Sequence, residues 1–200
     1  LLMVLEPLTP PGAKSRLGKI GLGGLLAALW AAVVAHSSPG TAFQGMLVID
    51  GFATFFRVLV IVVGILATLS SFEYLKRERA ESGEYYALIL YSVSGQCLMV
   101  AANELILIFL GLEISSIATY VLAGYLRDDK RNNESALKYF LLGSFATAFL
   151  LYGIAWIYGS TGATNLTDIR RVLTTPEIAP AGIAVGAAAA LMLVGFAFKV

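Results

Sequence analysis

The 200-residue sequence has few of the side chains on which redox proteins and hydrolases depend. It contains a single cysteine, Cys97, and a single histidine, His36. One cysteine excludes an intrachain disulfide framework and cannot supply the several thiolates that an iron–sulfur cluster needs. One histidine gives no basis for a metal site, and neither a glycine-rich phosphate loop nor a nucleophile elbow is present. We therefore expect no cofactor to bind in this chain.

Charged residues are also scarce. They make up 14% of the chain, against 58% apolar residues, and the net charge is +1. Average soluble proteins have about 25% charged and about 45–50% apolar residues. A net charge so close to zero gives no reason to expect binding to nucleic acid. Both deviations in composition indicate an integral membrane protein, with the lipid bilayer as its solvent.

Long apolar runs separated by short polar segments predict an all-α, polytopic transmembrane helix bundle. The runs are continuously apolar and about twice as long as the ~10 residues of a barrel strand, so helices are expected. We read the chain as a single transmembrane domain, residues 1–200, that is a fragment truncated at both ends. The expected spans are residues 1–5 (partial), 17–35, 53–72, 85–102, 105–125, 136–158 and 183–200 (partial). A short interfacial helix, Leu166–Leu173, is expected after a capping Asn165.

Basic residues gather in alternate loops. Nine Lys and Arg residues fall in the loops 6–19, 73–84 and 127–134, whereas the opposite loops hold only Arg170 and Arg171. Cytoplasmic loops of membrane proteins carry such an excess of Lys and Arg. The three basic loops are therefore predicted to be cytoplasmic.

Small residues at a spacing of four predict close helix contacts. One such set is Gly111, Ser115 and Thr119. A second set, near the C-terminal end, is Gly182, Gly186 and Ala190.

Glu113 is the acidic residue that this arrangement leaves deep in the membrane. It lies ten residues after Asn103, so about 15 Å along a helix, halfway through a hydrocarbon core of about 30 Å. A carboxylate at that depth costs roughly 2.5 kcal/mol or more. It needs a basic partner, a water-filled cavity or a bound proton. The alternative is that Glu113 only packs between helices, with its carboxyl group satisfied by hydrogen bonds. A Ser, Asn or Gln side chain could fill that role with a smaller desolvation cost.

Two lysines are candidate partners for this acid. Lys199 follows an apolar stretch and is placed past the midplane, although a lysine at a helix end also snorkels to the interface. Lys138 lies one turn after Glu134 near the start of its span, where a simple surface ion pair is the alternative. A buried acid with lysines on neighbouring helices is what a proton path requires.

Four segments resemble one family. They are Phe109–Ser116 around Glu113, Glu134–Ser144 around Lys138, Leu150–Leu166, and Gly195–Lys199. In these segments the chain resembles the antiporter-like membrane subunits of respiratory complex I. The resemblance is dense from about residue 84 to 200, and residues 1–83 match mainly in their helix pattern.

The resemblance implies a role for each site residue. Glu113 would be the acid on the fifth helix, Lys199 the lysine on a broken seventh helix, and Lys138 the lysine on the sixth. Glu113 would tune Lys199 through an ion pair, and Lys138 would assist the admission of protons. NADH, flavin, iron–sulfur clusters and quinone would bind in partner subunits, and other membrane subunits of the complex would surround this chain in a bacterial plasma membrane.

Two other functions remain open at this point. The chain is compatible with a cation/proton antiporter complex, because related subunits share the buried acid and lysine. It is also compatible with a structural or assembly subunit in which the buried charges hold the helices in register.

Overall fold

Eight helices and one short hairpin form the described part of the chain. The computed structural model describes residues 1–10, 14–176 and 181–199. Residues 11–13 of the predicted loop 6–19 and residue 200 of the last predicted span lie outside this description. The helices are α1 (Leu2–Leu5), α2 (Ser15–Ala35), α3 (Gly51–Arg77), α4 (Gly83–Ala101), α5 (Leu105–Ala123), α6 (Lys130–Thr161), α7 (Leu166–Thr174) and α8 (Gly182–Ala197). The strands β1 (Gly40–Ala42) and β2 (Leu47–Ile49) pair antiparallel.

The all-α transmembrane architecture expected from the sequence is confirmed, with the hairpin as an addition. Within the described residues, α2, α3, α5 and α6 are long and apolar enough to cross a membrane, and α8 is an apolar but shorter helix. The helix α4 has the same length as α5 but carries more polar residues. It packs against α1, α2, α3 and α5, so protein rather than lipid surrounds much of its surface.

Two helices extend well beyond their predicted spans. The helix α3 continues to Arg77 instead of ending near residue 72, and α6 starts at Lys130 instead of residue 136. The side chain of Asp129 caps α6 by accepting a hydrogen bond from the Arg131 amide at 2.8 Å. Basic residues at the end of α3 favourably meet the negative end of its dipole. Both extensions are polar, so hydropathy alone could not find them.

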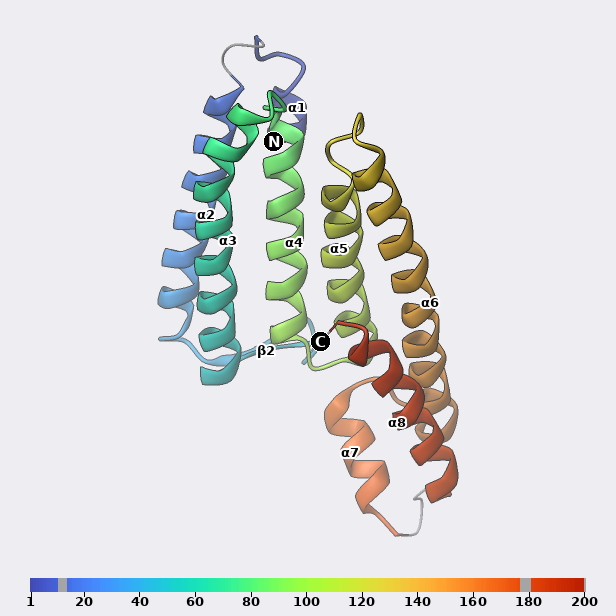
Figure 1. Ribbon diagram of the computed structural model, residues 1–200. Helices are drawn as coiled ribbons and strands as arrows, with labels where there is room; N and C mark the ends of the chain where they lie inside the picture. Colours follow the sequence, from blue (N-terminus) through green and yellow to red (C-terminus); the bar gives the residue numbers. More distant parts are fainter. Residues whose placement is uncertain (11–13, 177–180, 200) are drawn as a thin grey trace.

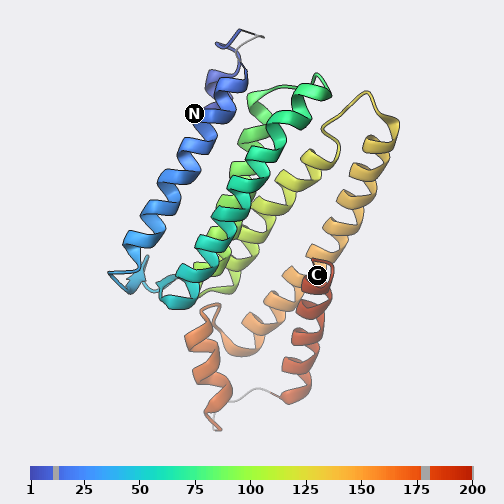
Figure 2. The same ribbon diagram turned by 60° about the vertical axis from the view of Figure 1, so that its left-hand side comes forward.

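The helices follow one another across the bundle from α2 and α3, through α4 and α5, to α6 and α8 (Figure 1). Consecutive long helices run in opposite directions. The loops 6–19, 73–84 and 127–134 consequently share one end of the bundle, here called the basic end, and the hairpin and α7 lie at the other, the hairpin end (Figure 1). The helix α8 then runs back along α6 and ends partway up it (Figure 2).

Glycines set the two closest helix crossings. A Cβ atom at Gly95 would lie 2.5 Å from the carbonyl oxygen of Gly111, so α4 and α5 touch backbone to backbone. A Cβ atom at Gly195 would lie 3.0 Å from the carbonyl oxygen of Ala146, so the backbones of α8 and α6 also approach closely. The predicted contact at Gly111 is thus confirmed. The prediction for Gly182 and Gly186 is wrong among the described residues, because no atom of another described element lies within 4 Å of a Cβ atom built at either one. The helix α8 instead packs on α6 with residues further along its length.

The hairpin end is tied together by backbone hydrogen bonds. The amide of Asn103, in the α4–α5 turn, donates to the carbonyl of Met46 in the hairpin at 2.7 Å, and the Asn103 carbonyl accepts from Leu166 at 3.0 Å. The predicted interfacial helix is confirmed as α7, and Asn165 caps it by accepting from the Thr167 amide at 2.9 Å.

The basic end is held by Glu6, a residue that the sequence analysis did not single out. Its carboxylate accepts from the Gly83 amide at 2.6 Å and from the Ser82 hydroxyl at 3.2 Å, and it pairs with Lys14 at 2.6 Å. Burial opposes ionisation of Glu6, but these hydrogen bonds and the Lys14 charge outweigh it and hold the pKa of the carboxyl below its usual value. The segment before α2 is thereby joined to the first turn of α4.

Candidate functional site

Three polar residues occupy one face of α5. Glu113, Ser116 and Tyr120 follow a spacing of three and four residues, which places their side chains above one another on a helix. Ser116 and Tyr120 are buried, and Glu113 is half-buried. This face is turned toward α6 and the end of α8, as the contacts described next show.

Glu113 lies one residue before the midpoint of α5. The hydroxyl of Thr147, on α6, donates a hydrogen bond of 2.9 Å to its Oε1 atom. The acid therefore has a donor on the neighbouring helix and is not simply exposed to acyl chains.

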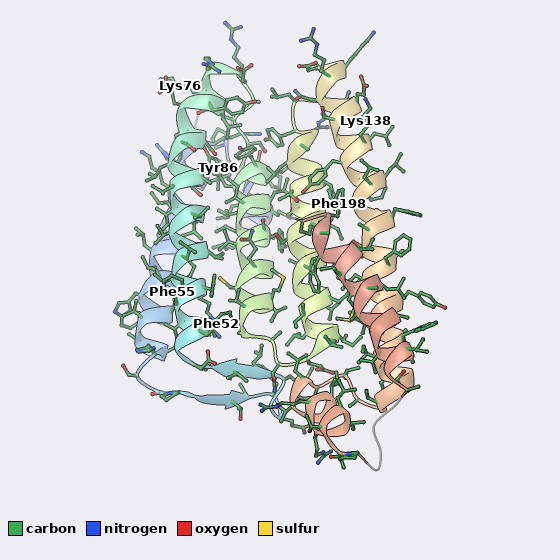
Figure 3. The ribbon with its side chains drawn as sticks, turned by 60° about the horizontal axis from the view of Figure 1, so that its bottom comes forward. Phe52, Phe55, Lys76, Tyr86, Lys138 and Phe198 are labelled. Atoms are coloured by element: carbon green, nitrogen blue, oxygen red, sulfur yellow. The ribbon has the colours of Figure 1, made fainter. Side chains whose placement is uncertain are left out.

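Lys199 reaches the same face of α5 from the end of α8. Its Nζ atom donates to the Ser116 hydroxyl at 2.7 Å and to the Tyr120 hydroxyl at 3.2 Å. The ammonium also lies 5.1 Å from the centre of the Tyr120 ring and 5.4 Å from that of Phe198, within the range of a cation–π contact. The Phe198 ring, labelled at the end of α8 in Figure 3, lies 6.0 Å from the Tyr139 ring of α6, measured between ring centres. Lys199 is thus held by protein groups and does not simply snorkel from a helix end.

The direct ion pair between Glu113 and Lys199 that the resemblance implied is not formed within the described residues. The two groups instead approach different positions of one helix face. Glu113 is met by Thr147, while Lys199 is met by hydroxyls one and two turns further along. On this face of α5, Ser116 is the residue between Glu113 and Tyr120.

Tyr120 is fixed by its packing against α6. The ring of Tyr139 stands edge-on to it, with centres 4.7 Å apart and an interplanar angle of 89°. The Tyr120 hydroxyl lies directly over Gly143, where an added Cβ atom would come within 2.0 Å of the oxygen. Glycine at position 143 is therefore what allows the tyrosine to present its hydroxyl to Lys199.

Lys138 is not brought to this cluster. Its side chain is 69% exposed and forms an ion pair of 2.5 Å with Glu134, which is 65% exposed. Both residues lie near the start of α6, at its basic end, and Figure 3 shows Lys138 well above Phe198. This geometry is that of a simple surface ion pair, the alternative role that the sequence left open for Lys138.

A second polar cluster lies on the opposite side of α5. The hydroxyls of Ser92, on α4, and Ser115 are 3.0 Å apart, and the Gln96 amide donates to both at 3.1 and 3.3 Å. This cluster lies beside the Gly95 crossing and satisfies its own polar groups. Over the ranges that the structure describes, no three His, Cys, Asp or Glu side chains come together as a metal site requires.

Sequence reasoning found the acid and the lysine but not the residues that hold them. Ser116 and Tyr120 could have been found by extending the helical spacing from Glu113. Thr147 and Gly143 carried no such signal, because their contacts with α5 depend on how α6 is rotated about its axis.

Comparison with known proteins supports the resemblance. Residues 102–200 match the family described as NADH:quinone oxidoreductase/Mrp antiporter, TM. The whole chain is 59% identical over 200 residues to NADH-quinone oxidoreductase subunit N 1 of Solibacter usitatus, of which it covers 41%. This chain therefore spans less than half of that relative's length.

Solved structures give the same result. A chain of respiratory complex I from Thermus thermophilus with bound aureothin aligns with 99% of this chain and 41% of its own length, with a TM-score of 0.78 and 32% identity. A chain of the membrane-bound sulfane sulfur reductase, an archaeal respiratory membrane complex, aligns with 98% of this chain and 41% of its own, with a TM-score of 0.76 and 28% identity. The resemblance seen in the sequence is confirmed, and the chain belongs to the NADH:quinone oxidoreductase/Mrp antiporter family of transmembrane subunits.

Proposed function

We propose that this chain is part of a proton-translocating membrane subunit of an NADH-quinone oxidoreductase. The observation that carries the proposal is the placement of Lys199 against Ser116 and Tyr120, on the same α5 face that holds Glu113 near mid-membrane. Charged groups in hydrocarbon are costly, and in membrane proteins they mark ion and proton pathways.

The chemistry of these groups suits proton transfer. A carboxylate and an ammonium can each exchange a proton, and a hydroxyl can donate one hydrogen bond while accepting another. Ser116 and Tyr120 therefore offer a route for a proton to and from Lys199, with Glu113 as the acid further along the same face. Because each group's charge changes the free energy of its neighbours, a proton gained at one favours release from the other.

Lys138 has a different place in the proposal. It is exposed and lies toward the basic end of α6, away from the cluster around Lys199. We assign it to the admission of protons from the aqueous side. Its ion pair with Glu134 would keep an exchangeable proton at the surface of the bundle.

The orientation and the partners follow from the charges and the relatives. We place the chain in a bacterial plasma membrane with the loops 6–19, 73–84 and 127–134 in the cytoplasm, because nine basic residues gather at that end. The redox steps would take place in other subunits, which hold NADH, flavin, iron–sulfur clusters and quinone. This chain would contribute protonatable groups and no electron carrier.

The experiment is to replace Glu113 with Gln in the whole complex. NADH-driven proton uptake into membrane vesicles is measured together with NADH:quinone turnover. Glu73→Gln is the control, because Glu73 is an exposed carboxylate on α3 that has no place in the proposed path. We expect proton uptake to fall in the Glu113 variant and to stay near wild type in the control. Unchanged pumping and turnover in both variants would defeat the role assigned to Glu113.

Two alternatives are separated by further measurements. The family also includes Mrp antiporters, and an exchanger would purify without flavin, iron–sulfur proteins or quinone reductase activity. A purely structural subunit would behave differently again. In that case, neutral substitutions of Glu113 and Lys199 would lower the yield of complex and leave its specific activity intact.

A further inference from the structure

Residues of α2, α3 and α4 line a groove. These helices form the side of the bundle away from α6 and α8 (Figures 1 and 2). The volume of the groove is about 640 Å³. The α2 side of the groove is formed mostly by residues with little or no side chain, so that a long, narrow ligand can approach the helix backbone closely. These residues are Gly24, Ala28, Ala31, Ala32 and Ala35.

Arg57 is the one charged residue among those that line this groove. It lies six residues after the start of α3 at Gly51, about 9 Å along the helix. The side chain is half-buried and has no ion pair or side-chain hydrogen bond with any described residue. An arginine without a counter-charge at this depth is costly in a membrane, so a ligand that supplies one negative charge would be favoured.

The length of the groove fits one leaflet of a bilayer. From Gly24 to Ala35 the helix α2 rises about 16 Å at 1.5 Å per residue, close to half of the ~30 Å hydrocarbon core. Arg57 lies toward the hairpin end of α3, the end at which Figure 3 labels Phe52 and Phe55. A headgroup bound there would place its acyl chain along α2 toward the middle of the membrane.

We propose that this groove binds an anionic phospholipid, with its phosphate on the Arg57 guanidinium and one acyl chain along the small residues of α2. Guanidinium groups bind phosphate oxygens through two parallel hydrogen bonds, and such charge-assisted bonds are strong. The remaining lining is apolar apart from Ser94 and Cys97, which suits a hydrocarbon chain and not a hydrated ion. The site is separate from the Glu113 and Lys199 cluster, so it stands independently of the proposed function.

The test uses the intact complex, purified in mild detergent and stripped of loosely bound lipid. Phosphatidylglycerol and phosphatidylcholine, each carrying a fluorescent acyl chain, are titrated into wild type, Arg57→Gln, Arg57→Lys and Ala28→Leu. Arg170→Gln, which removes an exposed arginine of α7 at the same end of the bundle, is the control. Native mass spectrometry of each variant reports the lipid that remains bound.

We expect phosphatidylglycerol to bind wild type and the control with equal affinity. Its affinity for Arg57→Gln should be lower by about tenfold or more, because one charge-assisted interaction is lost. Arg57→Lys keeps the charge and should retain most of the binding. Ala28→Leu keeps the charge but fills the groove, so it should lose affinity for the lipid. Equal binding of both lipids, or equal binding by wild type and Arg57→Gln, would overturn the proposal. So would a cross-link from a carboxylate of a neighbouring subunit to Arg57 in the native complex, because the groove would then be a protein interface.

Discussion

The crossing of α4 and α5 at Gly95 makes a quantitative prediction about how the acid-bearing helix is positioned. In a Gly95→Ala variant, the new Cβ atom would lie 2.5 Å from the Gly111 oxygen and 2.7 Å from the Ser115 nitrogen. Ordinary contact begins at 3.4 Å, so the helices must separate by about 0.9 Å. Both obstructing atoms belong to the backbone, so no side chain can rotate out of the way. Overpacking of this kind typically costs about 1–3 kcal/mol.

A matched control isolates that cost. In the part of the chain that the structure describes, no neighbouring element has an atom within 4 Å of a Cβ atom at Gly23, on α2, so Gly23→Ala gains the same helix propensity without a clash. We therefore expect Gly95→Ala to be less stable than Gly23→Ala by about 1–3 kcal/mol. The temperature at which the intact complex dissociates, followed on native gels, measures the difference. Proton uptake below that temperature should also fall in Gly95→Ala, because α5 carries Glu113.

Equal dissociation temperatures and equal proton uptake in the two variants would contradict this reasoning. That result would mean that α4 and α5 are further apart than described here, or that the position of α5 does not matter for transfer. A lower dissociation temperature with normal uptake would retain the packing argument and refute the link to function.

Three further predictions concern single side chains. Glu6→Gln should destabilise the protein, because the folded state holds the pKa of the Glu6 carboxyl below its usual value of about 4.5. Wild type should show its full stability advantage above about pH 4.5 and lose it as the pH falls through the lower pKa of the folded state. Thermal unfolding at a series of pH values measures this advantage. Thr147→Val keeps the side-chain shape but removes the hydroxyl that donates to Glu113, a hydrogen bond worth about 1.5–3 kcal/mol. Proton uptake should therefore slow about tenfold or more in Thr147→Val and stay near wild type in Thr147→Ser, which keeps the hydroxyl. Lys138→Gln breaks an exposed ion pair with Glu134 that is worth roughly 0.3–0.5 kcal/mol, so the dissociation temperature of the complex should hardly change. The rate of proton uptake should fall in this variant, because Lys138 is assigned to the admission of protons.

Helix positions were predictable because lipid imposes a strong rule on the sequence. Backbone groups in hydrocarbon must pair within their own segment, so each long apolar run becomes a helix. The alternation of basic loops also predicted which loops share an end of the bundle. The ends of α3 and α6 were not predictable in this way, because Lys76 and Arg77 and the first turn of α6 continue the helices beyond the apolar runs.

Depth was easier to predict than partners. Counting residues placed Glu113 near the middle of its helix, as α5 has it, since a helix rises by a fixed amount per residue. Counting did not give the rotation of α6 about its axis, which decides that Thr147 meets Glu113 while Lys138 faces outward. Nor could it show that Lys199 lies closer to Ser116 than to the acid. These relations depend on tertiary packing, above all on where Gly143, Gly153 and Gly195 let the helices approach.

The most direct measurement is NADH-driven proton uptake by the intact complex carrying Glu113→Gln, Lys199→Gln, or both substitutions. Groups that act as one unit show strongly non-additive losses. Each single variant should therefore lose about tenfold or more in uptake rate, and the double variant should be no slower than the slower single variant. Uptake at the wild-type rate in either single variant, or losses in the double variant that simply multiply, would contradict a shared proton path through this face of α5.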